Sequence, residues 1–220
     1  MTPDEIRAAV HRIGWWHQIP LGHGIVTPGG DHTGERLKVL GLPRDLTGVR
    51  VLDIGAWDGA FSFECERRGA AYVLAVDEFV WAGKSWASKE GFDFAHKVLN
   101  SRVESKLMDV YDLSPQNVGT FDLVLFSGVL YHLKHPLLAL ERVASVTDRH
   151  LILSSHIDLT DIARPAIAFY PGSELNNDAT NWVGPNIPAL EGMLLTAGFR
   201  RVELHASNIE EHWAVMHAWK

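Results

Sequence analysis

The chain has little cysteine, no long hydrophobic run and no excess of positive charge. Its 220 residues include one cysteine, Cys65, which excludes a disulfide framework or a cysteine-rich metal site and favours a reducing, cytoplasmic location. No apolar run approaches the ~20 residues that span a bilayer, so we expect no membrane association. Acidic residues outnumber basic ones by 27 to 20. The chain therefore lacks the basic field that gathers phosphates, which disfavours a nucleic-acid partner.

The hydrophobic pattern predicts an α/β fold. Residues 1–48 begin with a helix at 4–13 and continue into a segment dense in aromatic, histidine and glycine residues, which we interpret as an N-terminal cap. From residue 49 onward, short aliphatic strands alternate with helices, the pattern of a mostly parallel sheet. We expect seven strands at 49–54, 71–76, 103–108, 121–126, 149–154, 199–205 and 212–218, helices at 60–68, 84–100, 135–146 and 189–197, and an irregular insertion at 158–188. The prediction is a Rossmann-like domain over 49–220 that forms one compact unit with its cap.

A glycine-bracketed turn follows the first of these strands. Gly55 and Gly59 flank the turn at the carboxyl end of the strand, where open α/β sheets bind ligands. A dinucleotide fingerprint needs glycine at position 57 so that the backbone can approach a pyrophosphate, but this chain has Trp57. The turn therefore favours S-adenosylmethionine over NAD. The expected cofactor contacts here are Asp53, Gly55, Ala56, Trp57 and Gly59.

Further polar residues follow the next strands in order. Asp77 ends the strand at 71–76 and is predicted to accept the ribose hydroxyls, with Glu78 and Phe79 beside it. Asp109 is predicted to accept the adenine amino group while Met108 or Val110 contacts the ring. A helix or turn cap is the alternative role for Asp109. Ser127 starts the Ser-Gly turn after the strand at 121–126, where cofactor and acceptor are expected to meet.

This order of motifs resembles that of class I S-adenosylmethionine-dependent methyltransferases. More narrowly, the segments Ile19–Gly29 and Thr180–Asn186 look like the family of the bacterial tRNA wobble-uridine carboxymethyltransferase, and the likeness runs from about Trp15 to about Val202. The resemblance implies a Rossmann-like fold with a seven-stranded sheet. It also implies a methyltransferase that converts S-adenosylmethionine to S-adenosylhomocysteine.

The narrower resemblance raises the question of which group is transferred. That tRNA enzyme uses carboxy-S-adenosylmethionine and holds the extra carboxylate with basic and tyrosine side chains, including an arginine on the helix after the glycine turn. Glu64 aligns with that arginine here, and a carboxylate would repel a carboxylate. We therefore expect ordinary methyl transfer to a small-molecule acceptor, in first place an oxygen of a natural product or sugar.

Two alternatives stay open. The acceptor is a tRNA base if a basic surface forms beside the cofactor, for which the candidates are Lys84, Lys89, Lys97, Arg102 and Lys106. The second alternative is that the chain is a non-catalytic Rossmann module that only binds its ligand.

Methyl transfer to a hydroxyl benefits from a base, and histidine is the usual one. His132 and His156 follow the fourth and fifth strands, and His23 lies in the cap. These three are the candidate bases, although His132 alternatively only packs its own turn. Residues expected to line the acceptor pocket are Trp16, Tyr131, Tyr170, Asn181 and Trp182. His156 and Asp158 with His17 or His23 offer metal-binding atoms, but no compact ligand spacing is present, so we predict no metal.

Overall fold

The computed structural model describes residues 1–220, and these divide into two compact units, Met1–Asp109 and Val110–Lys220. The predicted division into a cap at 1–48 and a domain at 49–220 remains a prediction. The first unit contains α1 (Pro3–Val10), β1 (Pro20–Gly22), β2 (Ile25–Val26), α2 (Thr33–Val39), β3 (Arg50–Ile54), α3 (Ala60–Arg67), β4 (Tyr72–Asp77), α4 (Glu90–Leu99) and β5 (Glu104–Leu107).

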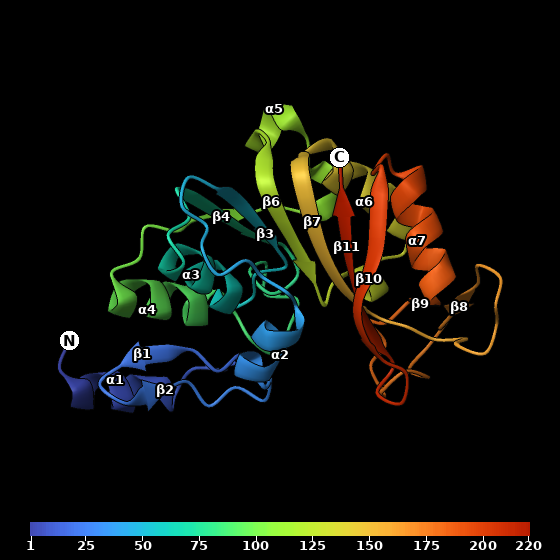
Figure 1. The fold of residues 1–220 in the computed structure, drawn as a ribbon. Helices are drawn as coiled ribbons and strands as arrows, with labels where there is room; N and C mark the ends of the chain where they lie inside the picture. Colours follow the sequence, from blue (N-terminus) through green and yellow to red (C-terminus); the bar gives the residue numbers. More distant parts are fainter. The chain divides into compact units, whose positions relative to one another are not determined.

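The second unit alternates strands and helices in the same way. It contains η1 (Val110–Asp112), α5 (Pro115–Val118), β6 (Phe121–Ser127), η2 (Leu130–His132), α6 (Pro136–Ser145), β7 (Thr147–His156), β8 (Ile167–Phe169), β9 (Val183–Pro185), α7 (Ile187–Thr196), β10 (Arg201–Asn208) and β11 (Trp213–Trp219). Helices α6 and α7 pack beside one another, α6 against β7 and α7 against β10 and β11 (Figure 1).

The main sheet has seven strands in the order β10-β11-β7-β6-β3-β4-β5. Strand β4 is parallel to β3 and β5, and β6 is parallel to β7, whereas β11 is antiparallel to both β7 and β10. This confirms the predicted α/β class and the mostly parallel Rossmann-like sheet. No helix has the combination of length and apolar character needed to cross a membrane.

Local signals explain where several helices begin. Thr2 and Glu5 form a reciprocal capping box around Pro3, the first residue of α1. The Asn186 side chain accepts from the N–H of Ala189 at the start of α7. Cys65 is fully buried on α3, since α3 packs against β3 and β4.

Two predicted helix boundaries and one predicted irregular stretch were wrong. The first helix ends at Val10 rather than at 13, and α4 begins at Glu90 rather than at 84. The second error has a tertiary cause: residues 84–89 follow an irregular path in which the Trp86 ring lies 5.6 Å from the ring of Trp57. The stretch at 158–188, expected to be irregular, contains β8 and β9, which pair as an antiparallel hairpin.

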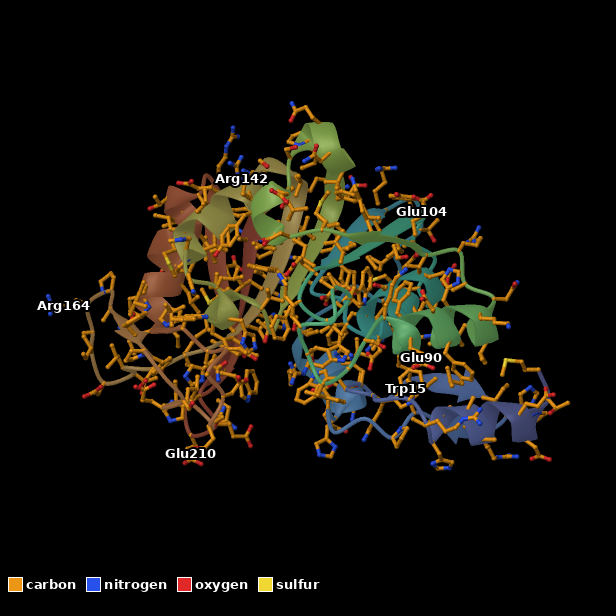
Figure 2. The ribbon with its side chains drawn as sticks, turned by 180° about the vertical axis from the view of Figure 1, so that it is seen from behind. Trp15, Glu90, Glu104, Arg142, Arg164 and Glu210 are labelled. Carbon is orange, nitrogen blue, oxygen red and sulfur yellow. The ribbon has the colours of Figure 1, made fainter.

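Figure 2 shows the side chains on the ribbon and labels several of them. Trp15, labelled there, is only 5% exposed and donates its indole N–H to the Val10 carbonyl at 2.9 Å, which ties the cap segment to the end of α1. Arg164, before β8, and Glu210, in the turn between β10 and β11, are both exposed.

A histidine cluster on β7, β10 and β11 predicts acid sensitivity. His150 Nε2 lies 3.1 Å from His217 Nδ1, and the His205 ring stacks on His217 at 4.3 Å. Burial, followed by the charges of His217, Arg201 and His205, lowers the pKa of His150 to about 4. Because the unfolded chain holds this proton up to a pKa of about 6.5, His150 stabilises the fold fully above that pH, and this contribution is lost as pH falls towards 4.

In a His150→Gln variant, we expect the free energy of unfolding to fall less between pH 6.5 and pH 4 than it does in the wild type. The expected difference is roughly 2 kcal/mol, a figure that allows for the partial exposure of His150. Urea titrations at each half pH unit measure it, with exposed His11→Gln as the control. Equal pH slopes for wild type and His150→Gln would contradict the prediction.

Candidate functional site

The glycine turn after β3 is tied to the neighbouring strand. The N–H groups of Gly55 and Ala56 both donate to the Val76 carbonyl of β4, at 2.8 and 3.1 Å. Gly55 and Gly59 have φ angles of +76° and +86°, a region that favours glycine. The turn is therefore fixed at the carboxyl ends of β3 and β4, as expected for a ligand loop.

Trp57 occupies this turn in the left-handed conformation, with φ +51°. This conformation costs a non-glycine residue about 1 kcal/mol or more, and local contacts offset the cost. Its N–H donates to Asp77 Oδ2 at 3.0 Å, and its carbonyl accepts from the Trp81 indole at 2.7 Å. Its ring lies 5.5 Å from that of Trp16 and 5.6 Å from that of Trp86. The turn is thus lined by an aromatic cluster of Trp16, Trp57 and Trp86.

The Asp77 carboxylate is buried and oriented by backbone donors. Oδ2 accepts from Trp57 N and Oδ1 from Val80 N at 2.9 Å. Burial raises the pKa of Asp77, and these hydrogen bonds oppose the shift. A backbone N–H of Trp81 is a third donor to Asp77. An ionised carboxylate offers about four acceptor positions, so it can still accept a hydroxyl. The residues present at this strand end therefore fit a ribose.

A second buried carboxylate, Asp58, attaches the cap to the turn. Asp58 Oδ2 accepts from the N–H groups of Trp16 and His17, each at 2.9 Å, and Oδ1 contacts His17 Nδ1. Asp58 is completely buried and His17 is 5% exposed. One side chain of the glycine turn thereby holds three groups of the cap.

The other predicted cofactor residues of the first unit have varied surroundings. Asp53 is buried and accepts from Ser62 Oγ at 2.6 Å, and burial raises its pKa to about 6. Glu78 pairs with Lys84, Phe79 is 41% exposed, and Asp109 is partly buried at the end of the unit. These positions lie around the turn and the ends of β4 and β5. The catalytic candidate His23 lies elsewhere, exposed in the β1–β2 hairpin turn.

Glu64 is paired with two arginines of its own helix. Its carboxylate pairs with Arg67 at 2.6 Å and with Arg68 at 2.7 Å on the same helix. Hydrogen bonds from these arginines outweigh partial burial and lower the pKa of Glu64. Its charge is therefore compensated locally, and the argument that Glu64 would repel a carboxylated cofactor loses its physical basis.

The predicted basic surface is largely neutralised too. Lys84 pairs with Glu78, Lys89 with Asp93 at 3.2 Å and Arg102 with Glu66 at 3.6 Å. Paired cations contribute little to a field that attracts phosphates.

The second unit gathers most of the predicted acceptor and catalytic residues. At the end of β7, His156 Nε2 lies 3.2 Å from the Tyr170 hydroxyl, which donates to Asp158 Oδ2 at 2.6 Å. Burial lowers the pKa of His156, partly opposed by the Asp158 charge. Gly184 makes room for this group, since a Cβ there would lie 2.8 Å from the Cβ of Asp158 and would overlap the Tyr170 hydroxyl.

Tyr131 and His132 lie beside this group. The Tyr131 ring is 4.2 Å from that of His132 and 6.1 Å from that of His156, and the Tyr131 carbonyl accepts from Trp182 N at 2.8 Å. The Trp182 carbonyl in turn accepts from Tyr170 N at 2.9 Å. The segment around Trp182 therefore holds η2 next to the β8–β9 hairpin, and the predicted residues Tyr131, His132, His156, Tyr170, Asn181 and Trp182 form one neighbourhood.

Three buried polar atoms have no hydrogen-bond partner: Trp57 Nε1, Ser127 Oγ and Asn181 Oδ1. All three belong to residues predicted to contact cofactor or acceptor. A buried polar group without a partner is costly unless a ligand or water satisfies it. These atoms consequently fit the binding of polar ligands in each unit.

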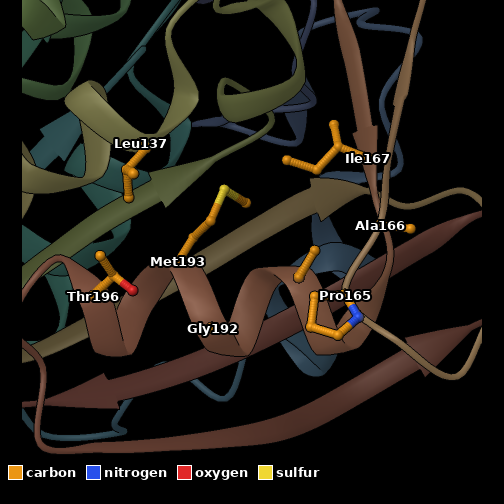
Figure 3. A pocket seen from close by; sticks show the side chains of 8 residues that line it. Leu137, Pro165, Ala166, Ile167, Gly192, Met193 and Thr196 are labelled. Atoms are coloured by element: carbon orange, nitrogen blue, oxygen red, sulfur yellow. The ribbon is translucent and has the colours of Figure 1, made fainter.

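A cavity of about 320 Å³ lies elsewhere in the second unit, between α6, α7 and residues 165–167 (Figure 3). Its lining is mainly apolar and includes Leu137, Ile167 and Met193, and none of the predicted site residues contributes to it. The structure contains no group of three or more histidine, cysteine or acidic side chains arranged to hold a metal ion.

Sequence reasoning missed several participants. Asp58 stands inside the glycine turn, but nothing in the sequence pairs it with His17, 41 positions earlier. Asp158 was considered only as a metal ligand. Thr180, which contacts His132, and Asp178, which accepts from Thr180, were not assigned any role. The pairing of Glu64 with Arg67 and Arg68 did have a signal, because residues three and four apart face each other on a helix.

Comparisons with known proteins agree with this fold. A family model described as a methyltransferase domain matches residues 32–204. The tRNA U34 carboxymethyltransferase of Pseudomonas savastanoi pv. phaseolicola is 30% identical over 173 residues, which cover 76% of this chain and 51% of that protein. The chain thus spans about half the length of the curated relatives it matches.

Solved structures show the same architecture. The N-terminal domain of EvdMO1, crystallised in the presence of SAH and D-fucose, aligns with a TM-score of 0.76 at 21% identity, covering 100% of this chain and 97% of that one. An S-adenosylmethionine-dependent methyltransferase from Mesorhizobium loti aligns with a TM-score of 0.61 at 19% identity, covering 87% and 99%.

Proposed function

Since the chain belongs to the family of S-adenosylmethionine-dependent methyltransferase domains, we propose that it methylates a hydroxyl oxygen of a small polar metabolite, such as a sugar. The observation that carries this proposal is the group of polar side chains in the second unit, where His156, Tyr170 and Asp158 are hydrogen-bonded in series. The unpartnered Asn181 Oδ1 adds an acceptor for a ligand hydroxyl. The crystallisation of the EvdMO1 domain with D-fucose supports a sugar-like acceptor.

The glycine turn and strand ends would hold the cofactor. We assign Asp77 to the ribose hydroxyls, because backbone donors orient its carboxylate and leave acceptor capacity on it. The proposed contacts with the remainder of the cofactor come from Asp53, Gly55, Ala56, Trp57, Gly59, Glu78, Phe79, Asp109, Val110 and Ser127. When bound, S-adenosylmethionine supplies an electrophilic methyl group on a positively charged sulfur.

The chain's own contribution is to position the acceptor and take up its proton. Most acceleration of a methyl displacement comes from holding the acceptor in line with water excluded. We propose that Trp16, Tyr131, Tyr170, Asn181 and Trp182 line the acceptor site. Burial lowers the pKa of both His132 and His156, so both imidazoles are neutral at pH 7 and can accept a proton. The exposed His23 is the weakest of the three candidate bases.

Two measurements test this function. Calorimetric titration is expected to show binding of S-adenosylmethionine and S-adenosylhomocysteine. Incubation with the methyl-labelled cofactor and a panel of sugars and hydroxylated natural products is expected to yield a labelled ether. Cofactor binding with label uptake only into amine or carbon acceptors would contradict the proposed acceptor atom.

A tRNA wobble uridine is the second candidate acceptor. The names of the curated relatives favour it, and the local pairing of Glu64 leaves a carboxylated cofactor admissible. The pairing of Lys84, Lys89 and Arg102 with carboxylates argues for weak tRNA binding. Tight, salt-dependent binding of tRNA in a filter assay would reverse this ranking.

A further inference from the structure

The ring of His132 is held by the segment that follows the β8 strand. His132 Nδ1 lies 3.1 Å from the Thr180 carbonyl and 3.1 Å from Thr180 Oγ1. Thr180 is itself oriented by Asp178, whose Oδ1 accepts from Thr180 N at 2.8 Å and from Thr180 Oγ1 at 2.7 Å. Three residues, Asp178, Thr180 and His132, thus form a continuous hydrogen-bonded series.

This geometry determines which ring nitrogen carries the proton. A carbonyl oxygen can only accept, so Nδ1 must donate to it. The Thr180 hydroxyl has a single proton, which it gives to Asp178, so its oxygen is also an acceptor towards Nδ1. Both partners therefore require hydrogen on Nδ1, which leaves the lone pair of the neutral ring on Nε2.

His132 Nε2 is available for a ligand. This nitrogen makes no hydrogen bond. It is also not one of the fully buried polar atoms without a partner, so it is accessible. Burial lowers the pKa of His132, and the hydrogen bond with Thr180 and the charge of Asp178 partly oppose this lowering. The other titratable groups close by are Tyr131 on the same turn and His156 at the end of β7.

We propose that Asp178 and Thr180 are positioning residues that fix His132 with hydrogen on Nδ1, so that Nε2 is the base for the acceptor hydroxyl. This inference rests on the proposed function. The acceptor oxygen forms a bond to the methyl carbon, the carbon–sulfur bond breaks with its electron pair remaining on sulfur, and the hydroxyl proton moves to Nε2. The imidazolium then lies in series with the Asp178 carboxylate and later releases its proton to water.

His156 is arranged differently. Its Nε2 is engaged with the Tyr170 hydroxyl, and its ring stacks on that of His212 at 5.8 Å. Burial lowers the pKa of His156, and the neighbouring His212 adds to this lowering. The arrangement assigns His156 to the orientation of Tyr170 and assigns proton transfer to His132.

Imidazole nitrogen spectra test the proton position without any turnover. The His132 signals in long-range ¹H–¹⁵N correlation spectra of the wild type at pH 8 are identified as those that disappear in a His132→Gln variant. In the wild type these signals are expected to show the pattern of a ring with hydrogen on Nδ1. A pattern of Nε2–H would overturn the proposal whether or not methyl transfer is found. In Asp178→Asn, which keeps an oxygen for Thr180 but removes the charge, the pKa of His132 is expected to fall. The exposed Asp161→Asn is the matched control and is expected to leave that pKa unchanged.

Kinetics give a second readout once an acceptor is identified. His132→Gln is expected to lower kcat by about 100-fold or more without changing cofactor affinity. In Asp178→Asn the acidic limb of the kcat–pH profile is expected to move to lower pH with a fall in kcat of about tenfold, while KM for the cofactor is unchanged. Thr180→Ser is expected to retain wild-type kcat, whereas Thr180→Val loses it in part. An unmoved acidic limb in Asp178→Asn, or a full loss of rate confined to His156→Gln, would contradict the assignment.

Discussion

Replacing Asp58 with alanine is expected to lower the free energy of unfolding by about 3 kcal/mol or more, and to weaken cofactor binding at the same time. The carboxylate accepts the N–H groups of Trp16 and His17 and contacts the His17 imidazole. The two contacts with His17 are buried, and the contact with Trp16 is partly buried. Alanine would leave these three polar groups without a partner. Each buried orphan costs on the order of 1–3 kcal/mol.

The expected loss of cofactor affinity follows from the position of Trp16, a residue of the cap, beside the glycine turn. Trp16 directly precedes His17 and its ring lies 5.5 Å from that of Trp57 in the glycine turn. Further cap contacts depend on the same segment: the His17 carbonyl accepts from Thr27 Oγ1 at 2.6 Å, and the Trp16 carbonyl from Asp31 N at 2.9 Å. Releasing residues 16–17 therefore frees one side of the aromatic cluster around Trp57.

Urea unfolding and calorimetric titration with S-adenosylhomocysteine measure the two effects. Asp58→Asn is the matched control, because an amide oxygen can still accept the two backbone N–H groups while its NH₂ can donate to a neutral His17 Nδ1. We expect Asp58→Asn to lose less than half as much stability as Asp58→Ala. Equal midpoints for Asp58→Ala and wild type would show that the cap does not depend on this carboxylate.

Gly59→Ala is the second substitution with a large expected effect, a loss of about 3 kcal/mol. Gly59 has φ +86°, and a Cβ there would lie 2.7 Å from ring atoms of both Phe63 and Phe92. Phe92 is 1% exposed and packs against Phe63 with ring centroids 5.3 Å apart, so neither ring has free space to move into. Both backbone strain and overpacking therefore oppose alanine at this position.

Gly48→Ala separates these two causes. Gly48 has a similar φ of +79°, but a Cβ there would meet no atom within 4 Å. Its substitution is expected to cost only the conformational term of about 1 kcal/mol. The difference between the two variants in thermal or urea unfolding then measures the clash with Phe63 and Phe92. If both variants lose the same stability, packing around Gly59 is looser than the structure indicates.

Much of the fold could be predicted because its signals are local. Each of the seven main strands was placed to within three residues at each end, since short aliphatic runs separated by helical periodicity are characteristic of parallel sheets. The helix start at Glu90 was missed because Trp86 packs onto a residue distant in the sequence, Trp57, and this contact overrides helical periodicity. The β8–β9 hairpin was missed because its strands have only three residues each.

The sequence by itself determined the order of the strands and helices, the glycine turn with a tryptophan where a pyrophosphate-binding loop needs glycine, and the carboxylates at successive strand ends. These features depend on residue type and short spacing. Only the tertiary structure decided which groups act together. Asp58 meets His17 across 41 positions, and His132 meets Thr180 across 48. Such partners are chosen by the path of the folded chain and by the need of each buried polar group for a hydrogen bond, neither of which is written in local spacing.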